Sequence, residues 1–495
     1  MPDLLEGELD DSLKQCMFYC WVQFQCHLQL LEITNYAIEN RVILSSLMTI
    51  GQNFISADNW SHPEWFDKRY TIGAPPDIFS FNGQNWYYPA WDWGAMRESN
   101  FLWLRQQIGH REQYFQATMF DHPLGLFRCW NIPANIDNPL FGHFVPSIPI
   151  NIQDLNNHQI TDIDNLCVPY FPVNDILSIN LPMSIKEKLI SNLSININGR
   201  YRFRPDFKSD REVSAAIKSF QEGLSFDEQL QLKLASKIIL SSFESICLIP
   251  DITSPHDKFY PRFSMTDSIV FKSLPEREAQ ILYKLFIDFY YRTNVSLWHE
   301  QGHQTLAVLS SSQMQFIGYD LGVSLNDEED SLHQAGICSF RVQRVPRDSS
   351  LRFDLTTTFP YLSVCTPSTH DMQHLKLLWS NDQADVQQFY YQVLKMEGIP
   401  PRELTPEIAH EIIKQHLQAQ SMWCLFQFED LFAISPKLSK LISSDWINNP
   451  AKKHDWSYRI NIKLEKLLEE NQNWTEEIAN LVDEAQRGRK ADYGF

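Results

Sequence analysis

The stretch YFQATMFDHPLGLF, residues 114–127, joins a short strand-forming run to a polar tip that begins at Asp121. Helical periodicity precedes it at residues 96–114, so we expect a strand that ends near Asp121. MQFIGYDLG (314–322) and YLSVCTPSTHD (361–371) repeat this order, each an apolar run that ends in polar residues. Catalytic groups of a (β/α)8 barrel lie at the carboxyl ends of its strands. The repeated order is the one expected of such an α/β barrel.

The flanking sequence adds further elements to this order. Residues 13–40 have the periodicity of an amphipathic helix, and residues 41–50, RVILSSLMTI, predict a buried strand. Residues 58–100 are rich in Gly, Pro, Asn and Trp, which predicts a long irregular loop that carries function. Residues 175–260 predict a mostly helical, polar insertion between barrel units. Residues 275–310 predict another helix.

Charge and composition narrow the class of partner. The 495 residues contain 61 Asp and Glu against 42 Lys and Arg, which gives a net charge of −19. This balance disfavours nucleic acid and anionic membranes as partners, and it is compatible with a neutral sugar polymer. Aromatic residues make up 13% of the chain, including 14 Trp, and their flat rings can stack on sugars.

The cysteine pattern and the first residues concern location. Nine cysteines, an odd number spread along a long chain, predict reduced thiols rather than a disulfide framework. Residues 1–13 are acidic and lack the pattern of a signal peptide, and the apolar run 17–31 is interrupted by glutamines and a histidine. We therefore expect no membrane span and a cytoplasmic protein.

Three carboxylates stand where predicted strands end: Asp121, Asp320 and Asp371. Glycosyl transfer with retention needs a nucleophilic carboxylate, an acid that protonates the leaving oxygen, and often a further carboxylate that grips sugar hydroxyls. The spacing is compatible with that set. The alternative is that each Asp caps a helix or a turn after its strand.

Longer motifs resemble one known family. GAPPDIFSFNGQNWYYPAWDW (73–93) resembles the long loop of amylomaltases and plant-type disproportionating enzymes, which are 4-alpha-glucanotransferases. Six further stretches follow in that family's order and near its spacing: FDHPLGLFRCWNIP (120–133), FYPRF (259–263), GYDLG (318–322), FRVQRVP (340–346), VCTPSTHD (364–371) and QSMWCLFQFEDL (420–431). The resemblance covers roughly residues 18–468.

The resemblance implies a (β/α)8 barrel that cleaves an α-1,4-glucosidic bond and passes the glucan from a covalent glycosyl-enzyme to another sugar. It assigns Asp121 to the nucleophile position and Asp371 to the position that stabilises the transition state. His122 and His370 would hydrogen-bond sugar hydroxyls. Along the glucan groove, the same comparison places three residues of the 73–93 loop: Gln84, Trp86 and Asp92.

The sequence also departs from the family at positions that matter for chemistry. Met119 stands where the family has an Arg that keeps the nucleophile Asp121 ionised and oriented. Tyr319 stands where the family has its acid/base Glu, and a phenol is a poor base at neutral pH. Leu47 and Asn53 occupy positions where plant-type members carry Asp. These substitutions predict impaired or absent activity.

The family's first barrel units have no counterpart in the sequence. We therefore expect a barrel that lacks these units, with barrel segments at 1–174 and 263–468, a helical insertion at 175–262 and a C-terminal helix at 469–495. An incomplete barrel leaves sheet edges and part of its core uncovered, so another chain that completes or covers the barrel is a further expectation.

Two other patterns have alternative explanations. HEQGH (299–303) fits the zinc-protease motif, but Gln301 and Gly302 replace apolar residues and no third ligand is evident. We interpret this segment as a polar helical surface, with no metal bound. Cys16, Cys20 and Cys26 with His27 predict core packing rather than a metal cluster.

Three hypotheses follow. The first is a 4-alpha-glucanotransferase with weakened chemistry, which acts on α-1,4-glucans and maltooligosaccharides without a cofactor. The second is a non-catalytic relative that binds glucan or pairs with an active paralogue. The third, a metalloprotease, depends on the HEQGH motif alone. The Trp residues at 86, 91 and 93 fit either a sugar platform or a core.

Overall fold

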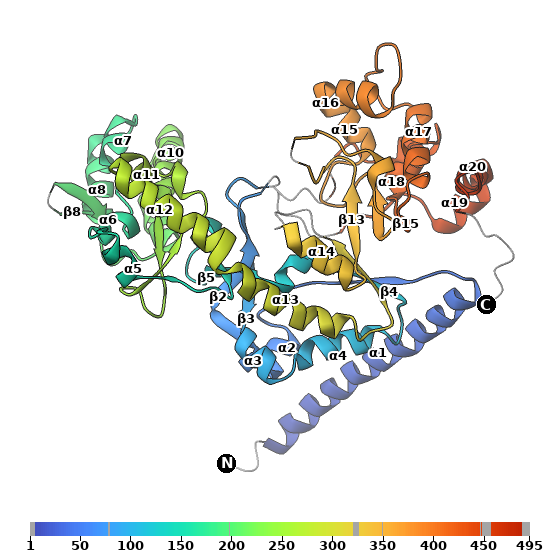
Figure 1. Cartoon of the computed structure of the whole chain (residues 1–495), viewed down its shortest axis with the longest axis horizontal. Coiled ribbons are helices and arrows are strands. Elements are labelled where there is room, and N and C mark those ends of the chain that lie inside the picture. Colours follow the sequence, from blue (N-terminus) through green and yellow to red (C-terminus); the bar gives the residue numbers. More distant parts are fainter. Residues whose placement is uncertain are drawn as a thin grey trace. The chain divides into compact units, whose positions relative to one another are not determined.

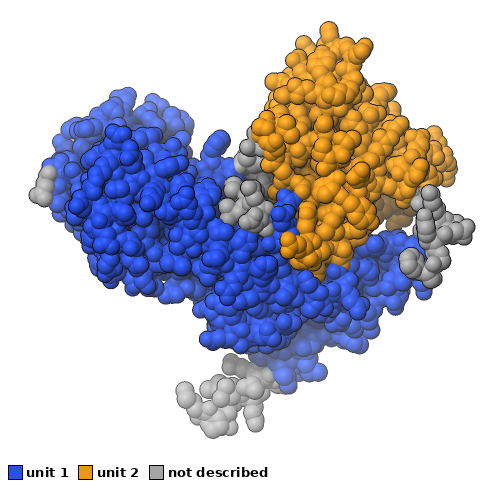
Figure 2. Space-filling model, in the orientation of Figure 1, with its two compact units in different colours: residues 1–116, 120–314, 322–331 blue, residues 117–119, 315–321, 332–495 orange. Residues whose placement is uncertain are grey.

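The computed structural model describes residues 5–77, 80–197, 199–319, 326–348, 350–445, 447 and 457–487. The chain divides into two compact units, drawn in blue and orange in Figure 2. Unit 1 comprises residues 1–116, 120–314 and 322–331, and unit 2 comprises residues 117–119, 315–321 and 332–495. Asp320, one of the three predicted strand-end carboxylates, lies outside the described residues.

Unit 1 begins with α1 (Leu5–Glu39), a single helix of 35 residues (Figure 1). It confirms the helix predicted over residues 13–40. One side of α1 packs inward, because Thr34 and Ala37 are buried and the Thr34 hydroxyl donates to the Tyr114 carbonyl at 3.0 Å. The described part of the chain contains no helix that is both long and apolar enough to cross a membrane.

The cysteines of α1 lie away from this inward side. Cys16, Cys20 and Cys26 are all exposed, so the prediction that they pack in a core is wrong. The sequence pattern could not separate the two sides, because apolar residues occur all around this part of the helix. His27 does reach inward, and its Nδ1 lies 2.7 Å from the Tyr114 hydroxyl.

The strand predicted at residues 41–50 forms as β1 (Ser45–Met48). It is not fully buried: Met48 is inside, whereas the Leu47 side chain is 51% exposed. Leu44, directly before β1, pairs with Gln116, directly before the strand that ends at Asp121. The Gln116 N–H donates to the Leu44 carbonyl at 3.1 Å, and the Leu44 N–H donates to Gln116 Oε1 at 3.0 Å.

Residues 58–100 are mostly regular, so the prediction of a long irregular loop is wrong. They contain α2 (Ala57–Ser61), β2 (Phe66–Ala74), β3 (Gln84–Trp91) and α3 (Trp93–Glu98). β2 and β3 pair antiparallel, with Phe66 opposite Trp91 and their rings stacked at 4.9 Å. The glycines serve this hairpin rather than a loop: a Cβ at Gly73 would lie 1.9 Å from the Gln84 carbonyl oxygen, and Gly83 has a positive φ of 77°.

β2 and β3 belong to a four-stranded antiparallel sheet with the order β3-β2-β5-β6, completed by β5 (Cys129–Pro133) and β6 (His143–Val145). Helix α4 (Leu102–Arg111) follows α3 and, together with it, accounts for the helical periodicity predicted at 96–114. The strand that ends at Asp121 is followed eight residues later by β5, which begins at Cys129. Because β3 and β5 lie in the same sheet, β3 is held close to the segment that follows Asp121.

The rest of unit 1 is mainly helical, and much of it shares a large apolar cluster that includes Leu189, Leu232 and Trp298. The predicted 275–310 helix is confirmed as α12 (Glu276–Asp288), a π-helical turn at Phe289–Thr293, and α13 (Val295–Leu309). The remaining elements are α5 (Ile152–Asn157), α6 (Ile163–Cys167), α7 (Val173–Ser178), α8 (Met183–Leu193), α9 (Asp210–Lys218), α10 (Phe226–Ser241), α11 (Ile269–Ser273), β7 (Ile150–Asn151), β8 (Ser194–Ile197), β9 (Arg200–Phe203), β10 (Leu248–Pro250) and β11 (Lys258–Pro261).

Unit 2 is built on parallel strands. β12 (Gln315–Tyr319), β13 (Cys338–Val342), β14 (Ser363–Thr366) and β15 (Trp423–Cys424) lie side by side in that order, and each pairs parallel with the next. β4 (Ala117–Asp121) lies next to β12 in the sheet, and its first three residues belong to this unit. The strands predicted in the three opening motifs are therefore confirmed, and they share one parallel sheet.

Helices follow these strands, as the barrel pattern requires. α15 (Leu375–Asn381), α16 (Gln383–Gln388) and α17 (Pro406–Leu417) lie between β14 and β15 in the chain, and α18 (Phe428–Phe432), α19 (Leu464–Glu470) and α20 (Gln472–Glu484) follow β15. α14 (Asn326–Gln334) lies between β12 and β13. Because parallel strands direct their carboxyl ends to one edge of a sheet, the residues just after β12 and β14 lie at the same edge.

Candidate active site

In unit 1, Asp121 is the last residue of β4, and His122 follows in the left-handed conformation with φ 53° and ψ 60°. This conformation is uncommon for residues other than glycine and is found often at functional sites. It returns the imidazole toward the preceding carboxylate, because His122 Nε2 lies 3.6 Å from Asp121 Oδ1. The Asp121 side chain is 27% exposed, so the carboxylate is partly accessible to solvent.

Strand β3 adds an aromatic face to this carboxylate. The Trp86 ring stacks on the His122 ring at 4.5 Å between centroids, with 27° between the planes. The Trp86 indole N–H donates to Gln84 Oε1 at 3.1 Å, which fixes the ring from the other end. Asp121, His122, Trp86 and Gln84, four residues predicted from the sequence as site residues, therefore form one continuous chain of contacts.

Asp92 has a different environment. Its Oδ1 accepts a hydrogen bond from the Ala95 N–H at 3.0 Å, and it is the N-cap of α3. This is the capping role that we considered as the alternative for strand-end aspartates. The neighbouring Trp91 and Trp93 are buried, so these two tryptophans belong to the core, whereas Trp86 is half-buried.

Unit 2 holds a second group of predicted residues. The Tyr319 hydroxyl, at the end of β12, donates to Asp371 Oδ2 at 2.7 Å. His370 Nε2 lies 3.3 Å from the same oxygen, and the Tyr319 and His370 rings are 5.5 Å apart at 26°. Asp371 thus receives a phenolic hydrogen bond in a chain where the family resemblance implies a neighbouring glutamate.

Tyr319 is held rigidly in this position. Its side chain is 4% exposed, and its ring meets Phe340 edge-on at 4.9 Å. Ile317, Val342 and Val364 complete this apolar cluster, and Met119 packs against it from β4. Both departures from the family, Met119 and Tyr319, therefore contribute to the same apolar packing, and neither supplies a charge.

A partly buried arginine and a fully buried aspartate hold the segment 367–374, which carries His370 and Asp371. Arg344 donates from Nε to the Pro367 carbonyl at 3.2 Å and from a terminal nitrogen to the Gln373 carbonyl. Asp430 accepts from the Leu375 N–H at 3.0 Å and from the Ser368 hydroxyl. Burial lowers the pKa of Arg344 to about 10 and raises the pKa of Asp430.

Arg344 and Asp430 were missed by the sequence reasoning as site residues, although both lie in motifs that carry the resemblance, FRVQRVP and QSMWCLFQFEDL. Their roles depend on contacts with backbone carbonyls and amide groups of a distant loop. A residue pattern does not reveal such contacts. The available signal was a charged residue among the apolar residues of each motif, because charges that fold into a core need partners.

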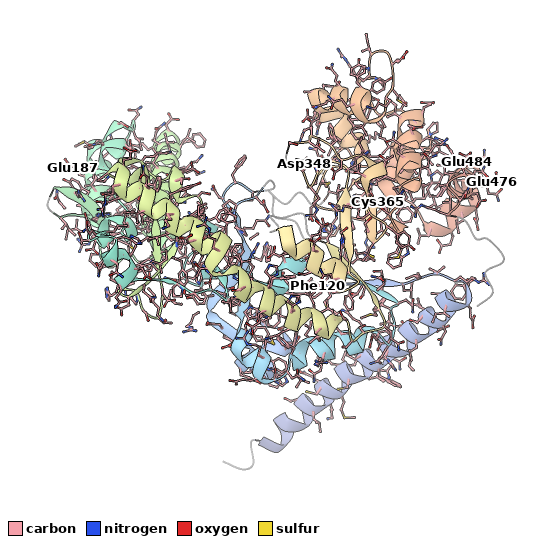
Figure 3. All side chains as sticks on the ribbon, in the orientation of Figure 1. Phe120, Glu187, Asp348, Cys365, Glu476 and Glu484 are labelled. Carbon is pink, nitrogen blue, oxygen red and sulfur yellow. The ribbon has the colours of Figure 1, made fainter. Side chains whose placement is uncertain are left out.

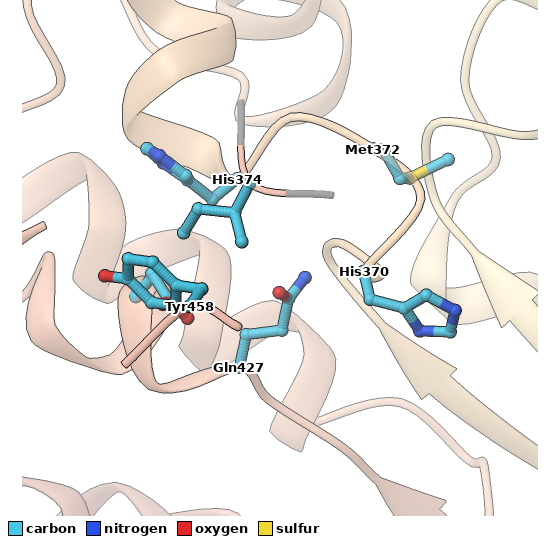
Figure 4. Close-up of a pocket in the computed structure, with 7 residues that line it drawn as sticks. His370, Met372, His374, Gln427 and Tyr458 are labelled. Atoms are coloured by element: carbon cyan, nitrogen blue, oxygen red, sulfur yellow. The ribbon is translucent and has the colours of Figure 1, made fainter. Parts of the chain in front are cut away.

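A small pocket opens beside His370 in unit 2 (Figure 4). Its floor includes Gln427, whose amide donates to the Ser368 hydroxyl at 2.8 Å. Polar, aromatic and apolar groups line it: His370, Met372, His374, Gln427, Glu429, Ile447 and Tyr458. Sequence reasoning singled out only His370 in this set. The mixture of one tyrosine ring with several hydrogen-bonding side chains is chemically suited to a hydroxyl-rich ligand.

The HEQGH segment lies on α13 in unit 1. Its two middle residues face inward: Gln301 accepts from the Arg97 guanidinium at 2.6 Å, and a Cβ at Gly302 would lie 2.1 Å from the Phe127 ring. The interpretation as a polar surface is therefore wrong for these two residues, although Glu300 and His303 are exposed. Among the described residues, no group of three or more His, Cys, Asp or Glu side chains is placed to hold a metal ion.

The chain is similar to known proteins of one family. The sequence model of the 4-alpha-glucanotransferase family matches residues 4–465. The chain is 33% identical over 466 residues to 4-alpha-glucanotransferase DPE2 of Oryza sativa subsp. japonica, covering 92% of this chain and 48% of the rice protein. It is 23% identical over 473 residues to the 4-alpha-glucanotransferase of Chlamydia pneumoniae, covering 94% of this chain and 60% of that protein.

Among solved structures, amylomaltase from Streptococcus agalactiae in complex with acarbose aligns with a TM-score of 0.51 and 14% identity, over 93% of this chain and 61% of that one. This is a likeness of fold. The present chain spans about half the length of the rice relative. The parallel strands with their following helices, the fold of amylomaltase and the match over residues 4–465 lead to one conclusion: the chain belongs to the 4-alpha-glucanotransferase family.

Proposed function

We propose that this chain binds α-1,4-glucans and retains 4-alpha-glucanotransferase chemistry in weakened form. The observation that carries the proposal is the contact chain of Asp121, His122 and Trp86. It combines a partly exposed carboxylate, an imidazole and an aromatic face within one sugar's reach. These are the groups that a retaining glycosyl transfer and a stacked sugar ring require.

Each residue has a role in the proposed reaction. Asp121 attacks the anomeric carbon, and the glucosidic bond to the leaving oxygen breaks as the ester forms. Asp371 stabilises the positive charge that develops on the sugar ring. Tyr319 is the proton donor to the leaving oxygen. The acceptor's 4-hydroxyl oxygen then attacks the anomeric carbon, its proton returns to the Tyr319 phenolate, and the bond from the glucan to Asp121 breaks.

The chemistry is weakened at the proton-transfer step. General acid/base groups contribute roughly 10²- to 10⁴-fold to rates, and a phenol with an ordinary pKa of about 10 is a poor substitute for a glutamate. In the structure the Tyr319 hydroxyl already donates its hydrogen bond to Asp371, so this bond must break before Tyr319 can protonate a leaving oxygen. Met119 provides no cation to keep Asp121 ionised.

The second candidate function is a non-catalytic glucan-binding protein or a partner of an active paralogue. The burial of Tyr319 and the packing of Met119 in one apolar cluster favour it, because both substitutions fit together as a stable arrangement. The two candidates share the binding site and differ only in turnover.

An incubation of the purified chain with maltotriose separates them. Transfer produces glucose together with longer maltooligosaccharides, which are resolved by chromatography. We expect slow product formation that disappears in Asp121→Asn and persists in Asp206→Asn, a matched exposed aspartate in the same unit. Protection against heat by maltooligosaccharide without any product would support the non-catalytic candidate. If the chain gives no product and maltooligosaccharide gives no protection against heat, glucan binding is refuted.

We also propose that a second polypeptide covers α1. Five large apolar side chains follow one face of this helix at spacings of three or four residues, and all are exposed: Leu13, Met17, Trp21, Phe24 and Leu28, at 61, 64, 58, 54 and 43%. An exposed apolar stripe of this kind is typical of an interface. The proposed partner, an active paralogue of the same family, would bury it.

Sedimentation of the chain mixed with a full-length 4-alpha-glucanotransferase tests this partner. Complex formation that is lost in Trp21→Ser/Phe24→Ser and retained in Tyr361→Ser, which removes an equally exposed aromatic from unit 2, supports the α1 interface. An unchanged sedimentation coefficient in every mixture would contradict it.

The wider organisation remains a proposal of the same kind. We propose a barrel with residues 175–262 as an insertion, and a cytoplasmic location in which the nine cysteines are reduced in the absence of an oxidant. The net charge of −19 supports glucan rather than nucleic acid as the polymer that is bound.

A further inference from the structure

Two thiols of unit 2 face each other across neighbouring strands. Cys365 on β14 and Cys424 on β15 are directly opposite in the parallel register, and their sulfur atoms are 3.4 Å apart. Neighbouring strands are about 4.8 Å apart, which lies within the range of Cα separations that a disulfide bridges. Both residues are reduced in the structure, and Figure 3 labels Cys365.

The surroundings keep this pair in place. The Cys424 thiol donates to the His416 carbonyl at 3.0 Å. Arg487 donates to four carbonyl groups of the segment that leads into β15, those of Leu417, Ala419, Ser421 and Met422. The guanidinium therefore fixes this segment and brings a positive charge close to the thiols.

The two sulfur atoms differ in accessibility and in acidity. Cys365 is fully buried, whereas Cys424 is partly exposed. Contact with the Cys424 sulfur lowers the pKa of Cys365, and the hydroxyl of Ser421 and the charge of Arg487 act in the same direction. The same contact raises the pKa of Cys424. The pair thus consists of a partly exposed thiol in contact with a buried one.

We propose that Cys365 and Cys424 are a redox-modification site that forms a reversible disulfide when the protein meets a peroxide. The Cys424 sulfur attacks one peroxide oxygen while its proton passes to the leaving oxygen. The O–O bond breaks, water leaves, and Cys424 becomes a sulfenic acid. The Cys365 sulfur then attacks the Cys424 sulfur, so the S–S bond forms, the S–O bond breaks, and the second oxygen leaves as water with the Cys365 proton. Two thiols lose two electrons in total, and both peroxide oxygens end at the level of water.

The bridge would connect β14 to β15 just before the segment 367–374, which carries His370 and Asp371. It would close a loop of 59 residues, and closing a long loop restricts the unfolded chain. Oxidation should therefore raise the thermal midpoint of unit 2 measurably. This inference is independent of the proposed function, because it depends only on the geometry of the two thiols.

Mass spectrometry of the full chain tests it directly. The protein is treated with about one equivalent of hydrogen peroxide, alkylated under denaturing conditions and digested. We expect a peptide pair joined through Cys365 and Cys424, the loss of two of the nine alkylatable thiols, and full recovery after dithiothreitol. Differential alkylation of the unmodified chain needs no variant, so the result does not depend on the folding of a mutant.

Variants assign the bond. Cys365→Ser and Cys424→Ser should each abolish the joined peptides, whereas Cys338→Ser, a buried thiol on the adjacent β13, should leave them. Cys16, Cys20 and Cys26 on α1 are internal reporters of exposed thiols. Oxidation of these reporters while Cys365 and Cys424 remain fully alkylatable would overturn the proposal, as would joining of Cys424 to any cysteine other than Cys365.

Discussion

The Tyr319 hydroxyl donates a hydrogen bond to Asp371 Oδ2 at 2.7 Å, and His370 lies 3.3 Å from the same oxygen. The hydrogen bond to Asp371 therefore comes from a phenol, at the position where the family resemblance implies a glutamate. This contact joins the ends of β12 and β14, so the substituted residue takes part in the structure of the site as well as in its chemistry.

Removing this hydroxyl should cost stability. Tyr319→Phe keeps the ring in its apolar cluster and leaves Asp371 without the phenolic donor. We expect the free energy of unfolding to fall by about 1 kcal/mol, because the hydrogen bond goes to a charged but partly exposed acceptor. Urea denaturation measures the change. Tyr361→Phe, which alters an exposed ring in the same unit, should have no effect, and an equal loss in both variants would contradict the assignment.

Restoring only the family's glutamate should lower the free energy of unfolding. Tyr319→Glu places a second carboxylate beside Asp371 at a position that is 4% exposed, and we expect a loss of about 3 kcal/mol. Met119→Arg in the same chain supplies a cation to the same cluster and should recover part of that loss. A double-mutant cycle from denaturation curves measures the coupling energy. Strictly additive effects would show that Met119 and Tyr319 do not act together.

Trp86 should contribute to glucan affinity through its ring. Trp86→Ala removes the ring face that stacks on His122. We expect the dissociation constant for maltoheptaose to rise about tenfold. Calorimetric titration measures it. Trp60→Ala is the matched control, because Trp60 lies on α2 in the same unit and is 85% exposed. Equal affinity in the wild type and Trp86→Ala would remove Trp86 from the site.

A buried histidine should make stability depend on pH. Burial lowers the pKa of His416 to about 4, while the unfolded chain keeps the ordinary value of about 6.5. The stabilisation from the neutral ring is therefore fully present above pH 6.5 and is lost as the pH falls toward 4. Its size is about 3 kcal/mol. Between pH 4 and pH 7, the free energy of unfolding should depend less steeply on pH in His416→Asn than in the wild type. His410→Asn, also on α17, should keep the wild-type slope. The same slope in all three proteins would rule out His416 as the source of the pH dependence.

The parallel part of the fold could be predicted from sequence, and the antiparallel part could not. β4, β12 and β14 are short apolar runs with polar tips, so local periodicity was sufficient to identify them. β2 and β3 contain glycines, prolines and asparagines, residues that usually mark loops. Here Gly73 permits close strand approach and Gly83 forms the turn, which only the pairing between the two strands makes evident.

The same contrast applies to the site. Asp121, His122, His370 and Asp371 follow predicted strands, so their positions could be inferred from the chain alone. Arg344 is different, because it holds carbonyl groups 23 and 29 residues away in the sequence. Contacts of that separation depend on tertiary packing and leave no periodic pattern.

The central claim, that Asp121 still performs the first chemical step while proton transfer is weakened, can be measured with α-maltosyl fluoride. Fluoride leaves without a proton donor, so the first step needs only the nucleophile, whereas release of the glucan needs a base. We predict a covalent maltosyl adduct that accumulates on the Asp121 peptide, detected by mass spectrometry, and that is absent in Asp121→Asn. A chain that binds maltooligosaccharides but never forms this adduct would contradict the claim and establish a glucan-binding protein without catalysis.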